Sequence, residues 1–82
     1  MSVTVYSKPG CMQCKATIKA LDRAGVKHTV IDVTNDDAAR NHLLRMGIQQ
    51  IPVVETDTER WSGFRPDRVA ALATASEQTR SA

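Results

Sequence analysis

The chain contains two cysteines, Cys11 and Cys14, separated by two residues. A cysteine acts as a nucleophile or metal ligand in its thiolate form, so a pair at this spacing can exchange disulfides or bind a metal ion. A disulfide between them would close a very short loop and constrain little of the unfolded chain, which makes it a poor structural cross-link. The spacing therefore predicts redox chemistry or metal binding.

The sequence around the pair indicates two different thiols. A strand is expected to end at Pro9-Gly10, so that Cys11 lies at the start of the helix that follows. There the free backbone N–H groups and the positive end of the helix dipole stabilise an anion, and Lys8 adds positive charge. Cys14 lies one turn further along, on the buried side. We expect Cys11 to be an exposed nucleophile of lowered pKa and Cys14 to be the shielded thiol that resolves its mixed disulfide.

Two other interpretations of the pair are less favoured. In the first, both thiols are small buried apolar groups without a chemical role. In the second, His28 and His42 complete a zinc site with the cysteines. These histidines are far more widely spaced than in finger-type sites, and they are expected on a strand and on a separate helix. We expect them to be ordinary surface or edge residues.

A second feature is the dipeptide Ile51-Pro52 at the start of a predicted strand. Proline has no N–H to donate to a sheet, so it belongs at an edge or in a loop. Ile51 could then offer its backbone to an extended segment of a partner by strand addition. The plainer alternative is a trans proline that only begins a strand, because cis is a small minority of X–Pro bonds.

The third feature is the run from Trp61 to Asp67, which contains the only tryptophan and the only phenylalanine. Aromatic side chains beside a glycine turn and an arginine suit a surface that binds a protein partner. Alternatively, the two aromatic side chains fill the small core and Arg68 stacks on the indole. Both interpretations stay open for the tryptophan, whereas partner binding is favoured for the loop that follows it. The candidate partner-binding residues of this run are Trp61, Ser62, Gly63 and Phe64.

The elements that must position these residues follow from apolar periodicity. Strands are predicted at Val3–Tyr6, Val26–Val33, Ile51–Val54 and Glu59–Ser62. Helices are predicted at Met12–Ala24, from the capping residues Thr34–Asp37 to Gly47, and from Pro66 onward. The second strand is expected to be buried on both faces, as in a parallel sheet.

The predicted order is β-α-β-α-β-β-α. Helices between the first strands imply right-handed crossovers and parallel pairing of strands one and two, and the last two strands form a hairpin. The fold class is therefore α/β, a four-stranded mixed sheet flanked by three helices in the minimal thioredoxin-like topology. Residues 1–75 are expected to form this domain, and residues 76–82 a flexible C-terminal tail.

Composition and charge narrow the functional classes. The chain has 82 residues and a net charge of only +2, which does not indicate a nucleic-acid binder. The beginning of the sequence has no positively charged segment followed by a long apolar run, so neither a signal peptide nor a membrane span is predicted. We expect a monomer in the cytoplasm, where disulfides are usually transient and catalytic.

Taken together, these motifs resemble the NrdH-type redoxins. The similarity covers roughly residues 3–73 and is carried by the segment Val5–Gly10, the Cys11-Met12-Gln13-Cys14 site, the Ile51-Pro52 strand and the run from Trp61 to Asp67. The cysteine motif alone is shared by many redoxins, and its combination with the aromatic run is far more specific. Met12-Gln13 is close to the Val-Gln common in that family.

The resemblance implies a function that composition cannot. Proteins of this family look like glutaredoxins but behave like thioredoxins. They take electrons from NADPH through thioredoxin reductase and pass them to the large subunit of class Ib ribonucleotide reductase. By this likeness the chain is an electron carrier with a redox-active Cys11–Cys14 disulfide and no bound cofactor. Pro52 would be a cis-proline beside the disulfide, with Lys8, Met12, Gln13 and Ile51 at the partner surface.

Two alternatives stay open. A glutathione-dependent glutaredoxin shares Lys8, the two cysteines and Pro52, but has Pro-Tyr where this chain has Met12-Gln13. It also has a Gly-Gly turn and an acidic segment where this chain has residues 62–66. The other alternative is a non-catalytic carrier of a metal or an iron–sulfur cluster.

Overall fold

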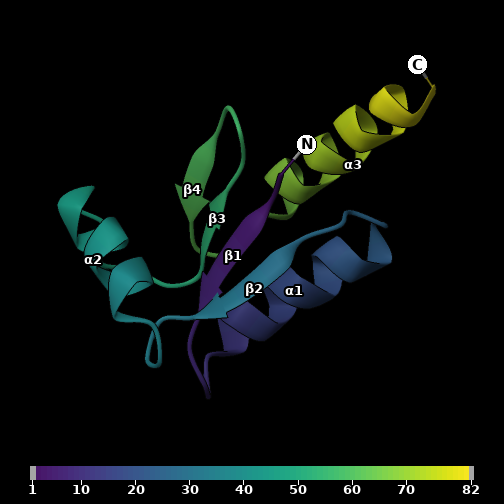
Figure 1. Ribbon diagram of the computed structural model, residues 1–82. Helices are drawn as coiled ribbons and strands as arrows, with labels where there is room; N and C mark the ends of the chain where they lie inside the picture. The colour runs from purple at the N-terminus through teal and green to yellow at the C-terminus, as the bar shows by residue number, and fades with distance from the viewer. Residues whose placement is uncertain (1, 82) are drawn as a thin grey trace.

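The computed structural model describes residues 2–81, with side chains as far as residue 74. Its elements follow the predicted order and are drawn in Figure 1. They are β1 (Thr4–Ser7), α1 (Met12–Arg23), β2 (Thr29–Asp32), α2 (Asp37–Arg45), β3 (Val53–Glu55), β4 (Arg60–Ser62) and α3 (Pro66–Ser81). The strand order in the sheet is β2-β1-β3-β4. The β1–β2 pair is parallel and the other two pairs are antiparallel, which confirms the predicted mixed sheet.

Helices cover both faces of the sheet, and each face has its own core (Figure 1). Because successive side chains of a strand point to opposite faces, Val5 and Val54 pack on one side, and Tyr6 and Val53 on the other. The first core takes Leu21 from α1 together with residues of α3, and the second takes residues of α2. The inner strands β1 and β3 are therefore buried on both faces.

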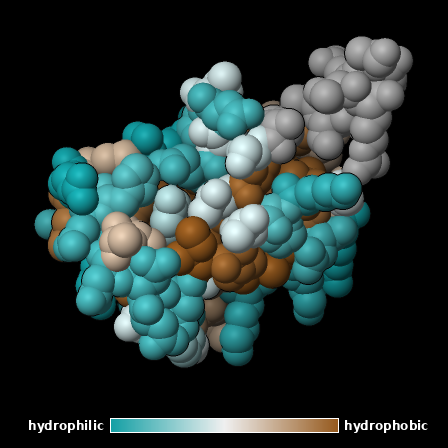
Figure 2. Space-filling model, viewed as in Figure 1, coloured by the Kyte–Doolittle hydropathy of each residue, from teal (hydrophilic) through white to brown (hydrophobic). Residues whose placement is uncertain are grey.

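The prediction that the second strand is buried on both faces is wrong. β2 lies at an edge of the sheet and pairs only with β1. Thr29 is exposed and Val30 is 45% exposed. Figure 2 shows hydrophobic atoms gathered in the middle of the face viewed in Figure 1, among hydrophilic side chains. Short edge strands are covered less completely by the helices than the strands between them, so an apolar sequence does not guarantee burial.

The helix boundaries agree with the local signals in the sequence. Asp36 caps α2, because its Oδ1 accepts a hydrogen bond from the Ala39 N–H at 2.9 Å. The chain leaves α1 and α2 through Gly25 and Gly47, whose φ angles of 71° and 72° lie in the left-handed region. Gly25 thus ends α1 and returns the chain toward the sheet, and Gly47 ends α2 and leads the chain toward the Ile51-Pro52 loop.

The third helix extends beyond the predicted domain boundary. α3 runs to Ser81, past residue 75, and Ala82 lies outside the described residues. The flexibility of residues 76–82 stays a prediction. Over the part of the chain that the structure describes, no helix is both long enough and apolar enough to cross a membrane.

Candidate active site

Cys11 occupies the N-cap of α1, as the sequence predicts. Gly10, with φ of 74°, turns the chain out of the loop after β1, and Cys11 is the last extended residue before the helix. Its Sγ accepts a hydrogen bond from the Cys14 N–H at 3.1 Å, and its carbonyl accepts one from the Lys15 N–H at 3.1 Å. The thiol sulfur therefore replaces the side-chain oxygen that commonly caps a helix, and it lies where an anion is stabilised.

The two thiols differ in burial and in acidity. Cys11 is half-buried, whereas Cys14 is 2% exposed, and both are free thiols. Desolvation acts to raise the pKa of Cys11, but hydrogen bonds from Cys14 and the charge of Lys8 outweigh it, so that pKa lies below the ordinary value of 9.0. Burial, followed by the hydrogen bond to Cys11, raises the pKa of Cys14 to about 11. The predicted roles of nucleophile and shielded thiol are thus supported by geometry and by electrostatics.

A depression of about 480 Å³ opens beside the Cys11 sulfur. Its lining joins the cysteine loop and the start of α1 to the loop before β3. It includes four of the predicted partner-binding residues, together with two glutamines that the sequence analysis missed. Polar residues in a loop carry no periodic signal, and only their place directly before Ile51-Pro52 could have indicated Gln49 and Gln50. The lining residues are Lys8, Cys11, Met12, Gln13, Gln49, Gln50 and Ile51.

The cis-proline loop and the turn after β4 meet next to the cysteine helix. The Ile51–Pro52 bond is cis, as the family resemblance implied, and Pro52 is fully buried. The Gly63 N–H donates to the Pro52 carbonyl at 2.8 Å. A Cβ at Gly63 would lie 3.8 Å from Gln13 Oε1, so the turn also approaches α1. Three segments far apart in the sequence therefore form one surface around Cys11.

The aromatic run divides between the core and the surface. Trp61 is 7% exposed in the core on the α1 and α3 side, and the Arg68 guanidinium lies 5.5 Å from its ring centroid. The alternative that placed both aromatic side chains in the core is confirmed for Trp61, which β4 directs inward and Arg68 stacks upon, and is wrong for Phe64. A role of Trp61 in partner binding stays a prediction. Ser62 is half-buried in β4, and Phe64 is 38% exposed in the turn.

Arg65 is occupied by an ion pair within the same turn. Its Nε and a terminal nitrogen donate to the two carboxylate oxygens of Asp67 at 3.2 and 3.0 Å. This bidentate contact, more than any other interaction, lowers the pKa of Asp67, to which the N–H groups of Asp67 and Arg68 also contribute. The start of α3 therefore already holds a carboxylate of its own, and Pro66 has no N–H to offer.

Neither histidine completes a metal site with the cysteines. His28 is half-buried directly before the edge strand β2, with Nδ1 2.8 Å from the Val26 carbonyl, so it is an edge residue as expected. His42 is half-buried, and its Nε2 lies 3.0 Å from Glu55 Oε2, so it too has a structural partner. Among the described residues, no group of three His, Cys, Asp or Glu side chains could hold a metal ion.

The fold and the site define a class of protein: a thioredoxin-fold protein with a thiol pair whose first cysteine caps a helix and shares a depression with the residue before a cis-proline. Comparison with known proteins agrees with this class. A family model for glutaredoxin matches residues 3–61. The structure of glutaredoxin-like NrdH-redoxin from Escherichia coli superposes with a TM-score of 0.85 at 38% identity, covering 88% of this chain and 95% of that chain.

Curated sequences point to the same family. The glutaredoxin-like protein NrdH of Salmonella typhimurium is 38% identical over 72 residues, which cover 88% of this chain and 89% of that protein. The glutaredoxin-like protein NrdH of Lactococcus lactis subsp. cremoris is 38% identical over 71 residues, which cover 87% of this chain and 99% of that protein. The chain therefore belongs to the NrdH group of glutaredoxin-like proteins.

Proposed function

We propose that this NrdH-type redoxin is a monomeric electron carrier of the cytoplasm that is reduced by thioredoxin reductase and reduces class Ib ribonucleotide reductase. It would use no bound cofactor, and NADPH would act only through the reductase. The observation that carries the proposal is the unequal thiol pair, with an accessible Cys11 of lowered pKa and a buried Cys14 whose pKa is about 11. The related E. coli NrdH-redoxin is described as having a thioredoxin-like activity profile.

The geometry gives each thiol one step. The Cys11 thiolate attacks a sulfur of the partner disulfide, the partner S–S bond breaks, and the second partner sulfur leaves as a thiolate that takes up a proton. Cys14 keeps its proton until then, because burial and the neighbouring Cys11 raise its pKa. Once the Cys11 sulfur is bonded to the partner, its negative charge is gone and Cys14 ionises more easily. Cys14 then attacks the Cys11 sulfur and releases the partner as a dithiol, with two electrons transferred.

The turn after β4 favours a protein reductant over glutathione. Glutathione is a small dianionic peptide, and a site for it needs free donors for two carboxylates. Near Cys11 the Gly63 N–H is already bound to the Pro52 carbonyl, and the Arg65 guanidinium is held by Asp67. Losing two hydrogen bonds to a charged group costs about 3 kcal/mol or more, roughly a hundredfold in affinity. A larger protein partner can instead contact the exposed Met12 and Phe64.

A reconstituted electron chain tests this function. NADPH, thioredoxin reductase, this protein and a class Ib ribonucleotide reductase are combined, and deoxyribonucleotide formation is measured. We expect synthesis to depend on this protein and to be abolished by Cys11→Ser. Efficient NADPH oxidation with a small disulfide but no deoxyribonucleotide would keep the redox chemistry and refute the assigned partner.

Trapping tests the order of the two thiols. Cys14→Ser is expected to accumulate a mixed disulfide between Cys11 and the partner, because the resolving thiol is missing. The matched variant Cys11→Ser keeps one cysteine but lacks the nucleophile, so it should trap no partner. Recovery of equal amounts of adduct from both variants, measured by non-reducing electrophoresis and mass spectrometry, would refute the assignment.

The principal alternative function is a glutathione-dependent glutaredoxin. It is favoured by the matching glutaredoxin family model. A carrier of a metal or an iron–sulfur cluster has less support from the described residues. Metal analysis of freshly purified, reduced protein would distinguish such a carrier from both redox functions.

A further inference from the structure

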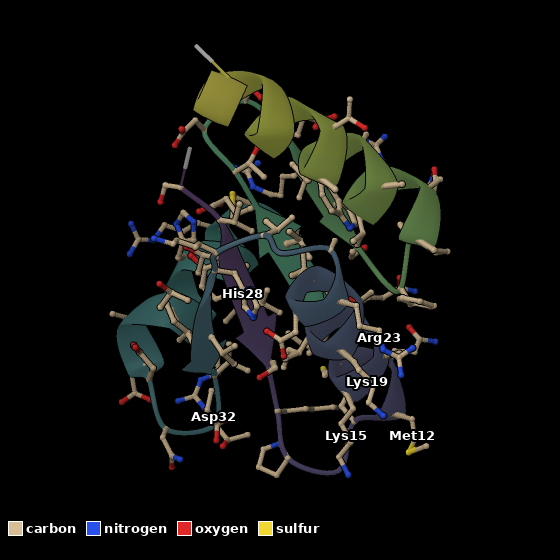
Figure 3. The ribbon with its side chains drawn as sticks, turned by 90° about the vertical axis from the view of Figure 1, so that its right-hand side faces the viewer. Met12, Lys15, Lys19, Arg23, His28 and Asp32 are labelled. Atoms are coloured by element: carbon tan, nitrogen blue, oxygen red, sulfur yellow. The ribbon has the colours of Figure 1, made fainter. Side chains whose placement is uncertain are left out.

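The exposed side of α1 carries a row of cations that begins next to the active site. Lys15, Lys19 and Arg23 follow one another at intervals of four residues and are all exposed. Figure 3 shows them in succession along α1, with Met12 near the end where Lys15 lies. Met12 directly follows the nucleophile Cys11 and is 77% exposed. The row therefore continues the surface at which a partner disulfide must approach.

The three cations of α1 share their lack of an ion pair with Lys8, Lys27 and Arg45, among the residues whose side chains are described, but not with the arginines that follow. Four arginines, Arg40, Arg60, Arg65 and Arg68, each lie within ion-pair distance of a carboxylate. No such pair is found for the three cations of α1 among the residues whose side chains are described. The only acidic residue of α1, Asp22, is directed to His28, with 3.5 Å between Oδ1 and Nε2.

Within the row, Arg23 stabilises the helix by its position, because a cation in the last turn interacts favourably with the helix dipole. Like charges four residues apart on a helix repel one another. A cation near the beginning of a helix is also unfavourably placed in the helix dipole, and the first turn of α1 contains no acidic residue to offset Lys15. Lys15 and Lys19 therefore slightly oppose helix formation, and their place in the row is better explained by binding than by folding.

We propose that the row formed by Lys15, Lys19 and Arg23 binds an acidic, extended segment of the partner protein that flanks its reactive cysteine. This inference rests on the proposed function, since it describes how the disulfide partner is recognised. Residues four apart on a helix are separated by about 6 Å along its axis. Alternate residues of an extended segment are separated by about 6.6 Å, so carboxylates at every second position match the three cations in register.

Synthetic peptides provide a direct test. Each peptide carries one cysteine activated as a 4-pyridyl disulfide, and the reduced full-length protein converts it to the peptide thiol and thiopyridone while forming its own Cys11–Cys14 disulfide. The acidic peptide has three Glu residues at alternate positions in one flank, and the amide peptide has Gln at the same positions. Both pairs are made, with the flank N-terminal or C-terminal to the cysteine. Thiopyridone release gives the rate.

At low ionic strength the acidic peptide is expected to react about tenfold faster than the amide peptide in at least one flank orientation, the effect of three modest surface ion pairs. The preference should disappear near 1 M salt, where the screening length falls to about 3 Å. Lys15→Gln/Lys19→Gln should remove most of it. The ratio of the two peptide rates is the readout, because a general change in Cys11 reactivity affects both peptides equally.

Single-charge controls locate the effect. Lys19→Gln and Lys27→Gln each remove one exposed positive charge, but only Lys19 belongs to the row. Lys19→Gln should lower the preference, and Lys27→Gln should leave it largely unchanged. Equal rates for acidic and amide peptides in both orientations would overturn the inference, as would equal losses in the two variants. Row-dependent binding of a single-stranded DNA oligonucleotide, without any peptide preference, would overturn it in favour of a nucleic-acid ligand. Failure to reduce either peptide would instead contradict the proposed redox function.

Discussion

In the reduced protein, iodoacetamide is expected to alkylate Cys11 much faster than Cys14 at pH 7. The pKa of Cys14 is about 11, so about one Cys14 thiol in 10⁴ is ionised at that pH. The pKa of Cys11 is lowered from 9.0, so more than about one Cys11 thiol in 100 is ionised. Ionisation alone therefore favours Cys11 by at least about a hundredfold.

Intrinsic nucleophilicity reduces this advantage without removing it. The more basic thiolate reacts faster, with a Brønsted slope of about 0.4–0.5. For a pKa difference of about two, the ionised Cys14 thiolate is therefore about tenfold more reactive than the Cys11 thiolate. A preference of at least about tenfold for Cys11 remains. The burial of Cys14, which is 2% exposed, increases it further.

The assay is a timed alkylation followed by digestion and mass spectrometry of the two modified peptide forms, repeated across pH. The Cys11 rate should have its midpoint at a pH below 9, whereas the Cys14 rate should have its midpoint near pH 11. Lys8→Gln should slow Cys11 at pH 7, because the Lys8 charge lowers its pKa, and Lys27→Gln serves as the matched control. Cys14 reacting as fast as Cys11 at pH 7 would refute the reasoning from burial and charge.

Three further predictions concern stability and reductant choice. Trp61→Ala should lower the free energy of unfolding in urea by roughly 3–5 kcal/mol because the indole is buried, whereas Phe64→Ala should cost much less, and equal losses would contradict this. Asp67→Asn removes the carboxylate that holds the Arg65 guanidinium, and it should raise glutathione-dependent turnover about two- to fivefold without changing turnover by thioredoxin reductase. An unchanged ratio of the two rates would show that this ion pair does not keep Arg65 from binding glutathione. Burial acts to raise the pKa of Glu55, but its hydrogen-bonded partners His42 and Arg60 lower that pKa below 4.5. The unfolded state therefore takes up the proton first, and the free energy of unfolding should fall as the pH is lowered through the pKa of the folded state. Glu55→Gln should flatten this pH dependence of stability, and an unchanged profile would exclude the contribution of Glu55.

The order of elements and the placement of the two cysteines follow from local sequence. A strand that ends at Pro9-Gly10 leaves Cys11 at a helix start, and the helical period then places Cys14 on the buried side. Each of these inferences depends on residues that are close in sequence, where turn chemistry and periodicity act directly.

The features that sequence could not settle depend on distant neighbours. The apolar residues of β2 predict burial, but the strand is partly exposed because it lies at the edge of the sheet. The sequence of one strand does not reveal its position in the sheet. Trp61 could face either side, and only the pairing of β4 with β3 directs it into the core. The role of Gly63 arises from its contact with Pro52, eleven positions earlier, across the same strand pair.

The proposed function requires that a protein reductase, rather than glutathione, supplies electrons to the Cys11–Cys14 pair. Its most direct test is NADPH oxidation with the oxidised protein and a terminal disulfide acceptor, driven either by thioredoxin reductase or by glutathione with glutathione reductase. Turnover should be rapid with thioredoxin reductase and lower by roughly a hundredfold with glutathione, the loss expected from two missing hydrogen bonds to a charged group. Equal turnover with the two reductants would contradict the proposed function and would establish a glutathione-dependent glutaredoxin instead.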